Sequence, residues 1–196
     1  MRNIILVILT LTLYSCAHTD SVLEVQHDAE MSFAGPIQEI ESLSFQPANI
    51  EDNRSDKERI GWKRNGFGQN TANITTSQPV MSIVSDGIQT GLEQNNHIVS
   101  DDGRIKIEGK INKFWFDTDV NFWTVEFIGD TQCELVFIDK MTNEQIYKST
   151  YSGSYSEKKG GGLSKTWQRI MSKAVDNLVE DIMFDEDLAD ALSELN

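Results

Sequence analysis

The fold is decided by Ile105-Lys106-Ile107-Glu108-Gly109-Lys110-Ile111, in which apolar residues and a glycine at odd positions alternate with charged residues at even positions. This two-residue period is typical of a strand with one buried face. The strand continues into Phe114-Trp115-Phe116, and residues 121–138 show the same period. Gly129-Asp130 is either a hairpin turn or the site of a bulge in one long strand, and the shared odd-numbered register favours the long strand. Residues 146–155 then supply the return strand.

A helix precedes these strands. In residues 80–92 the apolar side chains recur at intervals of three and four, which predicts an amphipathic helix with Ser77 as its N-cap. Gly87 and Gly91 lie on the apolar stripe, where each costs about 1 kcal/mol of helix propensity relative to alanine. Their expected benefit is a close approach of this helix to a sheet.

A second long helix is predicted for residues 163–183, and a short acidic amphipathic segment, residues 188–195, follows it. With a strand near residues 43–45, the order is strand, helix, three strands, helix. Strands joined by hairpins, with helices to one side, predict an α/β fold. We expect a two-layer sandwich with a mainly antiparallel sheet and two main helices packed on one side.

The N-terminus has the features of a bacterial lipoprotein signal. Arg2 precedes a run of about ten apolar residues, which is too short for the roughly 20 residues that span a bilayer. Ser15 stands directly before Cys16, so the segment resembles a lipobox, although Tyr14 is large for its place in that motif. The resemblance implies a signal peptide over residues 1–15 and acylation of Cys16. The alternatives are an ordinary secretory signal or an apolar N-terminus that is not cleaved.

The predicted organisation after the signal is a lipidated N-terminus with a polar tether, residues 16–42, and one globular α/β domain, residues 43–196. Residues 21–26 contain a short apolar patch, and they add a strand to the domain if they do not belong to the tether. Ala17, and not an aspartate, follows the cysteine. In Gram-negative bacteria this pattern resembles lipoproteins of the outer membrane that face the periplasm.

The chain is acidic, with 17 Lys and Arg residues against 31 Asp and Glu residues and a net charge of −14. Such a surface repels phosphates, so we expect no nucleic-acid partner and no broad contact with anionic head groups. From Ala174 onward the chain has no Lys or Arg, and its acidic residues indicate a solvated helix face, with an acidic docking surface as the alternative.

The sequence offers no strong catalytic or metal-binding pattern. Cys133 lies in a strand-like run, which favours a buried, inert thiol. The three histidines are far apart, and no spacing typical of a metal site, a phosphate-binding loop or a nucleophile elbow occurs. Asp117, Asp119 and Asp139 fall near strand ends, where they are the only evident acid–base candidates. We therefore expect no metal, no cofactor and no enzymatic activity.

The best functional candidate is a long polar loop predicted for residues 51–73. It concentrates cations, aromatic residues and glycines on an otherwise anionic chain, a composition suited to docking an acidic or planar partner. The candidate partner-binding residues are Arg54, Trp62, Lys63, Arg64, Asn65 and Phe67. Alternatively, the aromatic residues pin the loop to the domain and the cations neutralise nearby acids. The same choice, core filling or an aromatic groove, applies to residues 114–116 and to Phe122-Trp123.

From residue 43 onward the chain resembles the YajG-type family of small bacterial lipoproteins. The resemblance begins at Asp52-Asn53-Arg54 and continues through residues 60–68 and 71–74, the helix at residues 80–92, the strands, Tyr151-Ser152-Gly153 and the end of the last long helix. Its motifs are short, and their order and spacing carry the similarity. The resemblance implies the fold and a location in the cell envelope, but no catalytic residues.

Three functions follow as hypotheses. The first is a non-enzymatic, membrane-tethered module that binds or scaffolds a protein or another component of the envelope. The second is an envelope hydrolase acting on glycan or lipid, and the third is a structural subunit of a lipoprotein assembly. The membrane, reached through the lipid anchor, and an envelope protein are the expected partners.

Overall fold

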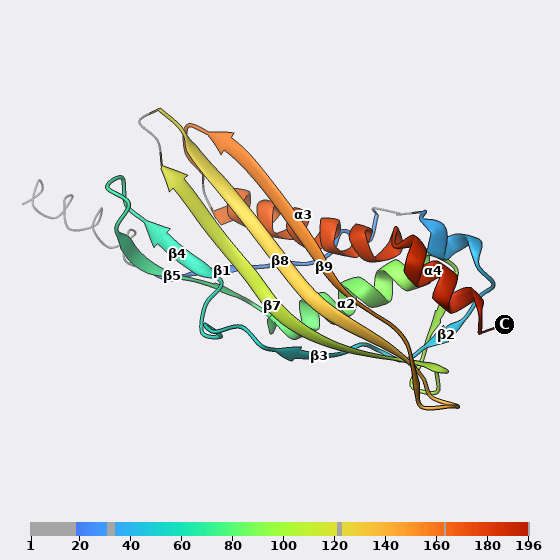
Figure 1. The fold of residues 1–196 in the computed structure, drawn as a ribbon. Helices are drawn as coiled ribbons and strands as arrows, with labels where there is room; N and C mark the ends of the chain where they lie inside the picture. The colour runs from blue at the N-terminus through green and yellow to red at the C-terminus, as the bar shows by residue number, and fades with distance from the viewer. Residues whose placement is uncertain (1–18, 31–33, 121–122, 163, 196) are drawn as a thin grey trace, which may run out of the picture.

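The structure is a computed structural model, and it describes residues 19–30, 34–120, 123–162 and 164–195. A large sheet forms one layer, and helices α2 (Val80–Gln94) and α3 (Ser164–Met183) cover one of its faces (Figure 1). The predicted two-layer α/β sandwich is confirmed. The signal peptide and Cys16 lie outside the described residues.

Three long strands form the main part of the sheet. They are β7 (Ile105–Val120), β8 (Val125–Asp139) and β9 (Glu144–Lys159), and each pairs antiparallel with the next. Gly129-Asp130 lies inside β8, so the prediction of one long strand is confirmed. The odd-numbered residues of β8 face the helices, among them the fully buried Cys133 and Leu135.

A bulge lies in β7 rather than at Gly129. Ile111 pairs with Cys133 and Lys113 pairs with Gln132, so Asn112 is an extra residue on its strand. The extra residue moves the buried side of β7 from odd to even positions. Phe114 therefore points into the core although it is three residues from Ile111. Core filling is the correct interpretation for Phe114 and Phe116, whereas Trp115 is half-buried on the other face.

Short strands extend the sheet beyond the other edge of β7. Next to β7 and parallel to it lie β2 (Ser44–Phe45), β3 (Asn49–Asp52) and β4 (Gly61–Arg64). Beyond them, β6 (Ile98–Val99) pairs with β2, and β5 (Asn70–Thr76) pairs antiparallel with β4. The prediction of a loop over residues 51–73 is therefore wrong, because the segment contains β4 and the start of β5. Its strands are short and polar, so they show no extended hydrophobic period.

The domain begins earlier than residue 43. Residues Ser21–Leu23 form β1, parallel to β5, which confirms the alternative of an added strand. Leu23 and Val25 are buried, and the 3-10 helix η1 (Pro36–Glu39) buries Ile37. Because this segment packs into the core, the described residues 19–30 and 34–42 belong to the domain and not to a tether.

The two long helices pack on each other as well as on the sheet. The buried stripe of α2 is confirmed, but its N-cap is Pro79, without a side-chain cap, and not Ser77. Gly87 and Gly91 face α3: an added Cβ at Gly91 would lie 2.7 Å from Val179 Cγ1, and one at Gly87 would lie 3.1 Å from Val179 Cγ2. The expected approach to a sheet is thus an approach to the neighbouring helix.

The acidic C-terminal run is only partly solvated. Asp176 on α3 is 1% exposed, and its Oδ1 lies 2.9 Å from His27 Nδ1. Asp185 caps α4 (Glu186–Ser193) through Leu188 N and also accepts a hydrogen bond from Tyr151 Oη at 2.7 Å. The expectation of a solvated face is therefore wrong for these two residues. Among the helices that the structure describes, none has the length and apolar character needed to cross a bilayer.

Candidate functional site

The β4–β5 tip, residues 65–69, carries one of the predicted partner-binding side chains at its apex. Asn65 organises the turn, because its Oδ1 accepts hydrogen bonds from Phe67 N at 2.9 Å and from Gln69 N at 3.0 Å. Gly68 takes a φ of +77°, which glycine adopts without strain. The Phe67 side chain is left 91% exposed. Asn65 thus has a structural role in presenting Phe67.

The two cations before the tip bind to other parts of the domain. Lys63 Nζ donates to the carbonyl oxygen of Thr19 at 2.6 Å. Arg64 forms an ion pair of 2.8 Å with Asp117 and donates to the carbonyl oxygen of Thr118 at 2.7 Å. Lys63 therefore holds the start of the described chain against the hairpin, and Arg64 holds the hairpin against the end of β7.

Trp62 and Arg54 differ from the expectation of exposed groups. Trp62 is half-buried, and the Arg59 guanidinium lies 4.1 Å from the centre of its ring. Arg54 is only 7% exposed and pairs with Asp52 through Nε at 2.9 Å and a terminal nitrogen at 2.8 Å. Arg54 also donates to the carbonyl oxygen of Phe114. Arg54 therefore has a structural role, and it is not an exposed partner-binding group.

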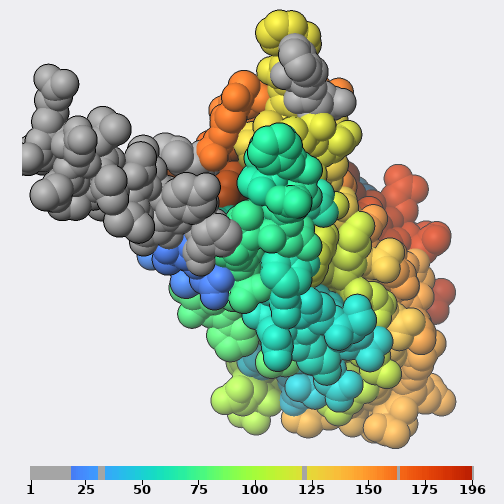
Figure 2. Space-filling model, turned by 90° about the vertical axis from the view of Figure 1, so that its left-hand side faces the viewer, coloured from blue at the N-terminus to red at the C-terminus, as the bar shows by residue number. Residues whose placement is uncertain are grey.

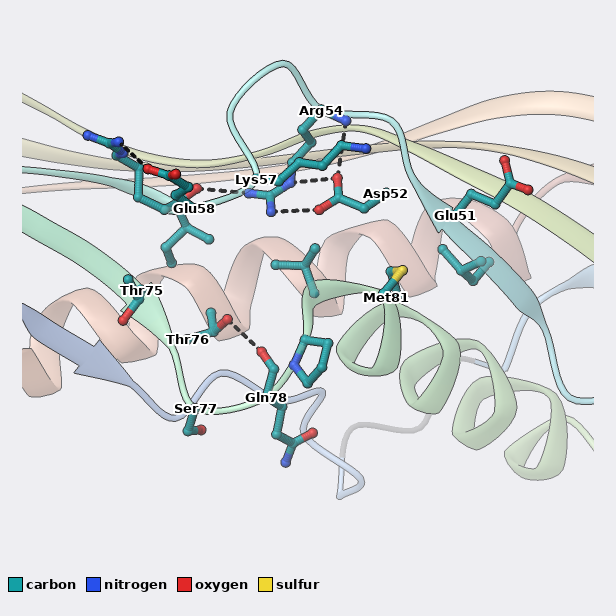
Figure 3. A pocket seen from close by; sticks show the side chains of 15 residues that line it. Glu51, Asp52, Arg54, Lys57, Glu58, Thr75, Thr76, Ser77, Gln78 and Met81 are labelled. Carbon is teal, nitrogen blue, oxygen red and sulfur yellow. Dashed lines mark hydrogen bonds and ion pairs between the residues drawn. The ribbon is translucent and has the colours of Figure 1, made fainter.

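A pocket of about 780 Å³ lies beside the predicted residues, and we call it the β3–α2 pocket. Residues 50–60, which run from β3 into β4, form one wall, and residues 75–81, which lead into α2, form the other. Figure 3 shows Asp52, Arg54 and Lys57 on one side of the space and Thr76, Gln78 and Met81 across from them. The sequence indicates Arg54 in the first wall as a candidate, but no residue of the second wall, because only the fold brings residues 50–60 and 75–81 together.

The charges in the β3–α2 pocket are largely paired with one another. Burial alone would raise the pKa of Asp52, but the hydrogen bonds from Arg54 outweigh it and hold that pKa below its ordinary value. Arg59 pairs with Asp56 at 2.9 Å and with Glu58 at 3.1 Å. Among the described residues that line the pocket there is no histidine or cysteine. The pocket thus offers a polar surface on which the half-buried carboxylate of Asp52 is held ionised by Arg54.

Asp139 lies too far from Asp117 and Asp119 to form an acid–base site with either of them, whereas Asp117 and Asp119 are two residues apart on β7. Asp139 lies on β8, where it pairs with Ile105 of β7. Asp117 of β7 pairs with Ile128, which is eleven residues before Asp139 on β8. At about 3.4 Å per residue these positions are about 35 Å apart, far beyond the separation of under about 10 Å that glycosidases use. Asp139 has a structural role, because Arg104 donates hydrogen bonds to its carboxylate and lowers its pKa. Within the described residues, no cluster of three His, Cys, Asp or Glu side chains could hold a metal ion.

Cys133 is expected to be unreactive in the folded protein. It is fully buried, and burial raises the pKa of its thiol to about 12. In a Cys16→Ser chain, a thiol reagent at neutral pH should modify Cys133 only after denaturation, whereas an added Met141→Cys, at an 80% exposed position, should react at once. Rapid modification of Cys133 under native conditions would contradict its placement in the core.

At the end of the molecule that carries the β4–β5 tip, Trp123 follows the described end of β7 and is 84% exposed, so core filling is wrong for it. Phe122 lies outside the described residues. Asp20 accepts a hydrogen bond from Asn73 N at 2.7 Å and so fixes the chain entering β1. Figure 2 shows this end face-on: the β4–β5 hairpin projects toward the viewer, and the described residues at the start of β8 lie above it.

A solved structure shares this fold. A protein from Xanthomonas campestris matches with a TM-score of 0.57 and 8% identity, over 91% of this chain and 99% of its own. A putative lipoprotein from Caulobacter crescentus gives a TM-score of 0.43 and 12% identity, over 75% and 92% of the two chains. A minor lipoprotein from Acinetobacter baumannii gives 0.43 and 10%, over 74% and 90%.

In sequence, no curated protein matches the chain. A family described as uncharacterized lipoprotein matches residues 44–193, which include nearly every described strand and helix after the first strand. Since this match covers most of the chain, the protein belongs to that family of uncharacterized lipoproteins.

Proposed function

We propose that this protein is a YajG-like envelope lipoprotein, anchored through acylated Cys16 to the outer membrane and facing the periplasm, where it binds a partner without enzymatic turnover. The lipoprotein family supports the anchor, and Ser15, Cys16 and Ala17 support its position and membrane. One acyl chain binds a bilayer only marginally, whereas several chains on one cysteine hold it firmly. The anchor keeps the domain at a surface, where a binding module meets its partner.

The β3–α2 pocket is the observation that carries the binding role. It combines a volume of about 780 Å³ with exposed polar and apolar groups, among them Lys57 and Met81. Its carboxylate at Asp52 is held by Arg54 and has a lowered pKa, so it is poorly suited to donate a proton near neutral pH. Lys57 is exposed in one wall of the pocket, and Glu51 and Glu58 are exposed beside it. We take Lys57 as the group that recognises an acidic segment of an envelope protein, a role in binding and not in chemistry.

Photo-crosslinking in living cells tests this role. A photoreactive amino acid at Met81, which lines the pocket, should give one defined adduct with an envelope protein, because the bound partner lies within reach of that side chain. The same group at Met141, which is exposed at the far turn between β8 and β9, should give none. Lys57→Glu should abolish the Met81 adduct, and Lys140→Glu, an exposed lysine next to Met141, should leave it unchanged. Equal adducts from both positions, or an adduct indifferent to Lys57→Glu, would remove the pocket from the proposal.

A further inference from the structure

The described chain starts close to the proposed anchor and is fastened at its first residues. Thr19 is three residues after Cys16, a separation of about 10 Å even when fully extended. Lys63 Nζ holds the carbonyl oxygen of Thr19, and Asn73 N donates to Asp20. An acyl group on Cys16 therefore cannot be far from the β4–β5 hairpin. The end of the domain that faces the membrane is fixed by these contacts.

The same hairpin extends beyond the point where Thr19 is held. Phe67 is four residues after Lys63, which is at most about 13 Å along a strand. This length is similar to the reach from Thr19 to Cys16. The apex of the β4–β5 tip can therefore lie level with the acylated residue, at the surface of the bilayer.

The two most exposed large apolar side chains that the structure describes both lie at this end. Phe67 is 91% exposed at the β4–β5 tip, and Trp123 is 84% exposed at the turn between β7 and β8. Figure 1 shows the β4–β5 hairpin, the end of β7 and the start of β8 at the end where β1 enters the sheet, and the Arg64–Asp117 ion pair ties the hairpin to the end of β7. Aromatic side chains of this kind favour the interface between lipid and water.

The distribution of charge also favours contact between this end of the domain and the membrane. At the end that carries Phe67, three acids pair with cations: Arg64 with Asp117 at 2.8 Å, Lys158 with Glu126 at 3.4 Å, and Lys159 with Glu157 at 2.8 Å. Asp119 is exposed at this end as well. Helix α4 lies at the opposite end (Figure 1). The acidic residues on and beside it are Asp185, Glu186, Asp187, Asp190 and Glu194. An anionic membrane therefore repels the far end and tolerates the near end.

We propose that the domain rests on the membrane through this end, with Phe67 and Trp123 in the head-group region of the bilayer that holds the acyl chains of Cys16. This inference depends on the proposed lipid anchor. The occupant of the exposed aromatic tips is lipid and not a second protein. In this orientation the β3–α2 pocket, which lies on the flank of the domain between residues 50–60 and 75–81, stays open to a partner.

Spin labelling of the acylated full chain in vesicles of phosphatidylethanolamine and phosphatidylglycerol tests the orientation. Nitroxides are placed at Phe67→Cys, at Trp123→Cys and, as the control, at Met141→Cys, whose side chain is 80% exposed at the other end of β8. The parent chain should take up no label, because Cys133 is buried. Collision with oxygen relative to a water-soluble nickel complex should be several-fold higher at positions 67 and 123 than at 141.

Other outcomes separate the inference from the anchor. If the wild-type protein floats with the vesicles and the Cys16→Ser protein does not, the anchor stands. If all three labels then collide mainly with the nickel complex, the proposed orientation is wrong. A label at 67 shielded from both reagents would indicate a protein contact, and equal lipid exposure at 141 would indicate another orientation; each overturns the inference. If the wild type fails to float, or Cys16→Ser floats equally, the proposed anchor itself fails.

Discussion

Replacing Gly153 by alanine is expected to destabilise the domain by about 3 kcal/mol or more. Gly153 lies on β9 beneath α3, where an added Cβ would be 2.0 Å from the carbonyl oxygen of Ala174 and 2.4 Å from Leu178 N. Both are backbone atoms, so the helix must move as a unit to make room. Thr131 Oγ1 lies 3.1 Å from the carbonyl oxygens of both Gly153 and Ala174, and a displaced helix loses that contact as well.

Chemical denaturation followed by circular dichroism measures this effect. Gly160→Ala is the matched control, because an added Cβ there meets no atom within 4 Å, and it should change the free energy of unfolding by less than about 1 kcal/mol. If Gly153→Ala is as stable as Gly160→Ala, α3 does not lie as close to the sheet as the structure shows.

Asp176→Ala is expected to cost about 3 kcal/mol, since it leaves buried donors without their acceptor. The Asp176 carboxylate is 1% exposed, accepts a hydrogen bond from Asp28 N at 2.8 Å and lies 2.9 Å from His27 Nδ1. The pair joins α3 to the segment that follows β1, so its loss should loosen the N-terminal segment first. Asp190→Ala, an exposed change in the same acidic run, should have little effect.

The cost of Asp176→Ala should depend on pH. Burial alone would raise the pKa of Asp176, but hydrogen bonds from His27 and Asp28 outweigh it and lower that pKa below its ordinary value. Because the folded pKa lies below the unfolded one, this carboxylate stabilises the protein fully above about pH 4 and loses that contribution as the pH falls through the folded pKa. Unfolding free energies of both chains between pH 3 and 7 should therefore converge at the acid end. A difference that is constant with pH would contradict an ionised Asp176 carboxylate.

The long elements could be predicted because their hydrophobic periodicity is sustained over many residues. The alternation in β7 and β8 and the stripe of α2 each extend over many residues, and a buried face leaves a clear pattern at that length. β1, β4 and β5 bury few apolar side chains and rely on backbone pairing, which leaves little trace in the sequence. The glycines on α2 show the same limit: the sequence predicts that something approaches Gly87 and Gly91, but not that it is α3.

The candidate site could be predicted only in part, for a related reason. Composition identifies a cluster of cations and aromatic residues, but it does not show which charges are already paired. Arg54 and Arg64 resemble each other in sequence, yet one is buried against Asp52 and the other bridges two strands. Phe67 and Trp123 share one end of the molecule because β7 extends to the same level as the β4–β5 hairpin (Figure 1). That proximity depends on strand register, which follows from packing.

We propose above all that Cys16 carries the lipid that holds this domain at the envelope. Intact-mass spectrometry of the protein extracted from bacterial membranes tests this lipid attachment most directly. We expect a chain that begins at Cys16, lacks residues 1–15 and carries the added mass of three acyl groups and a glyceryl link on that residue. A chain that retains residues 1–15, or one that begins at residue 16 or elsewhere with no added mass, would contradict it.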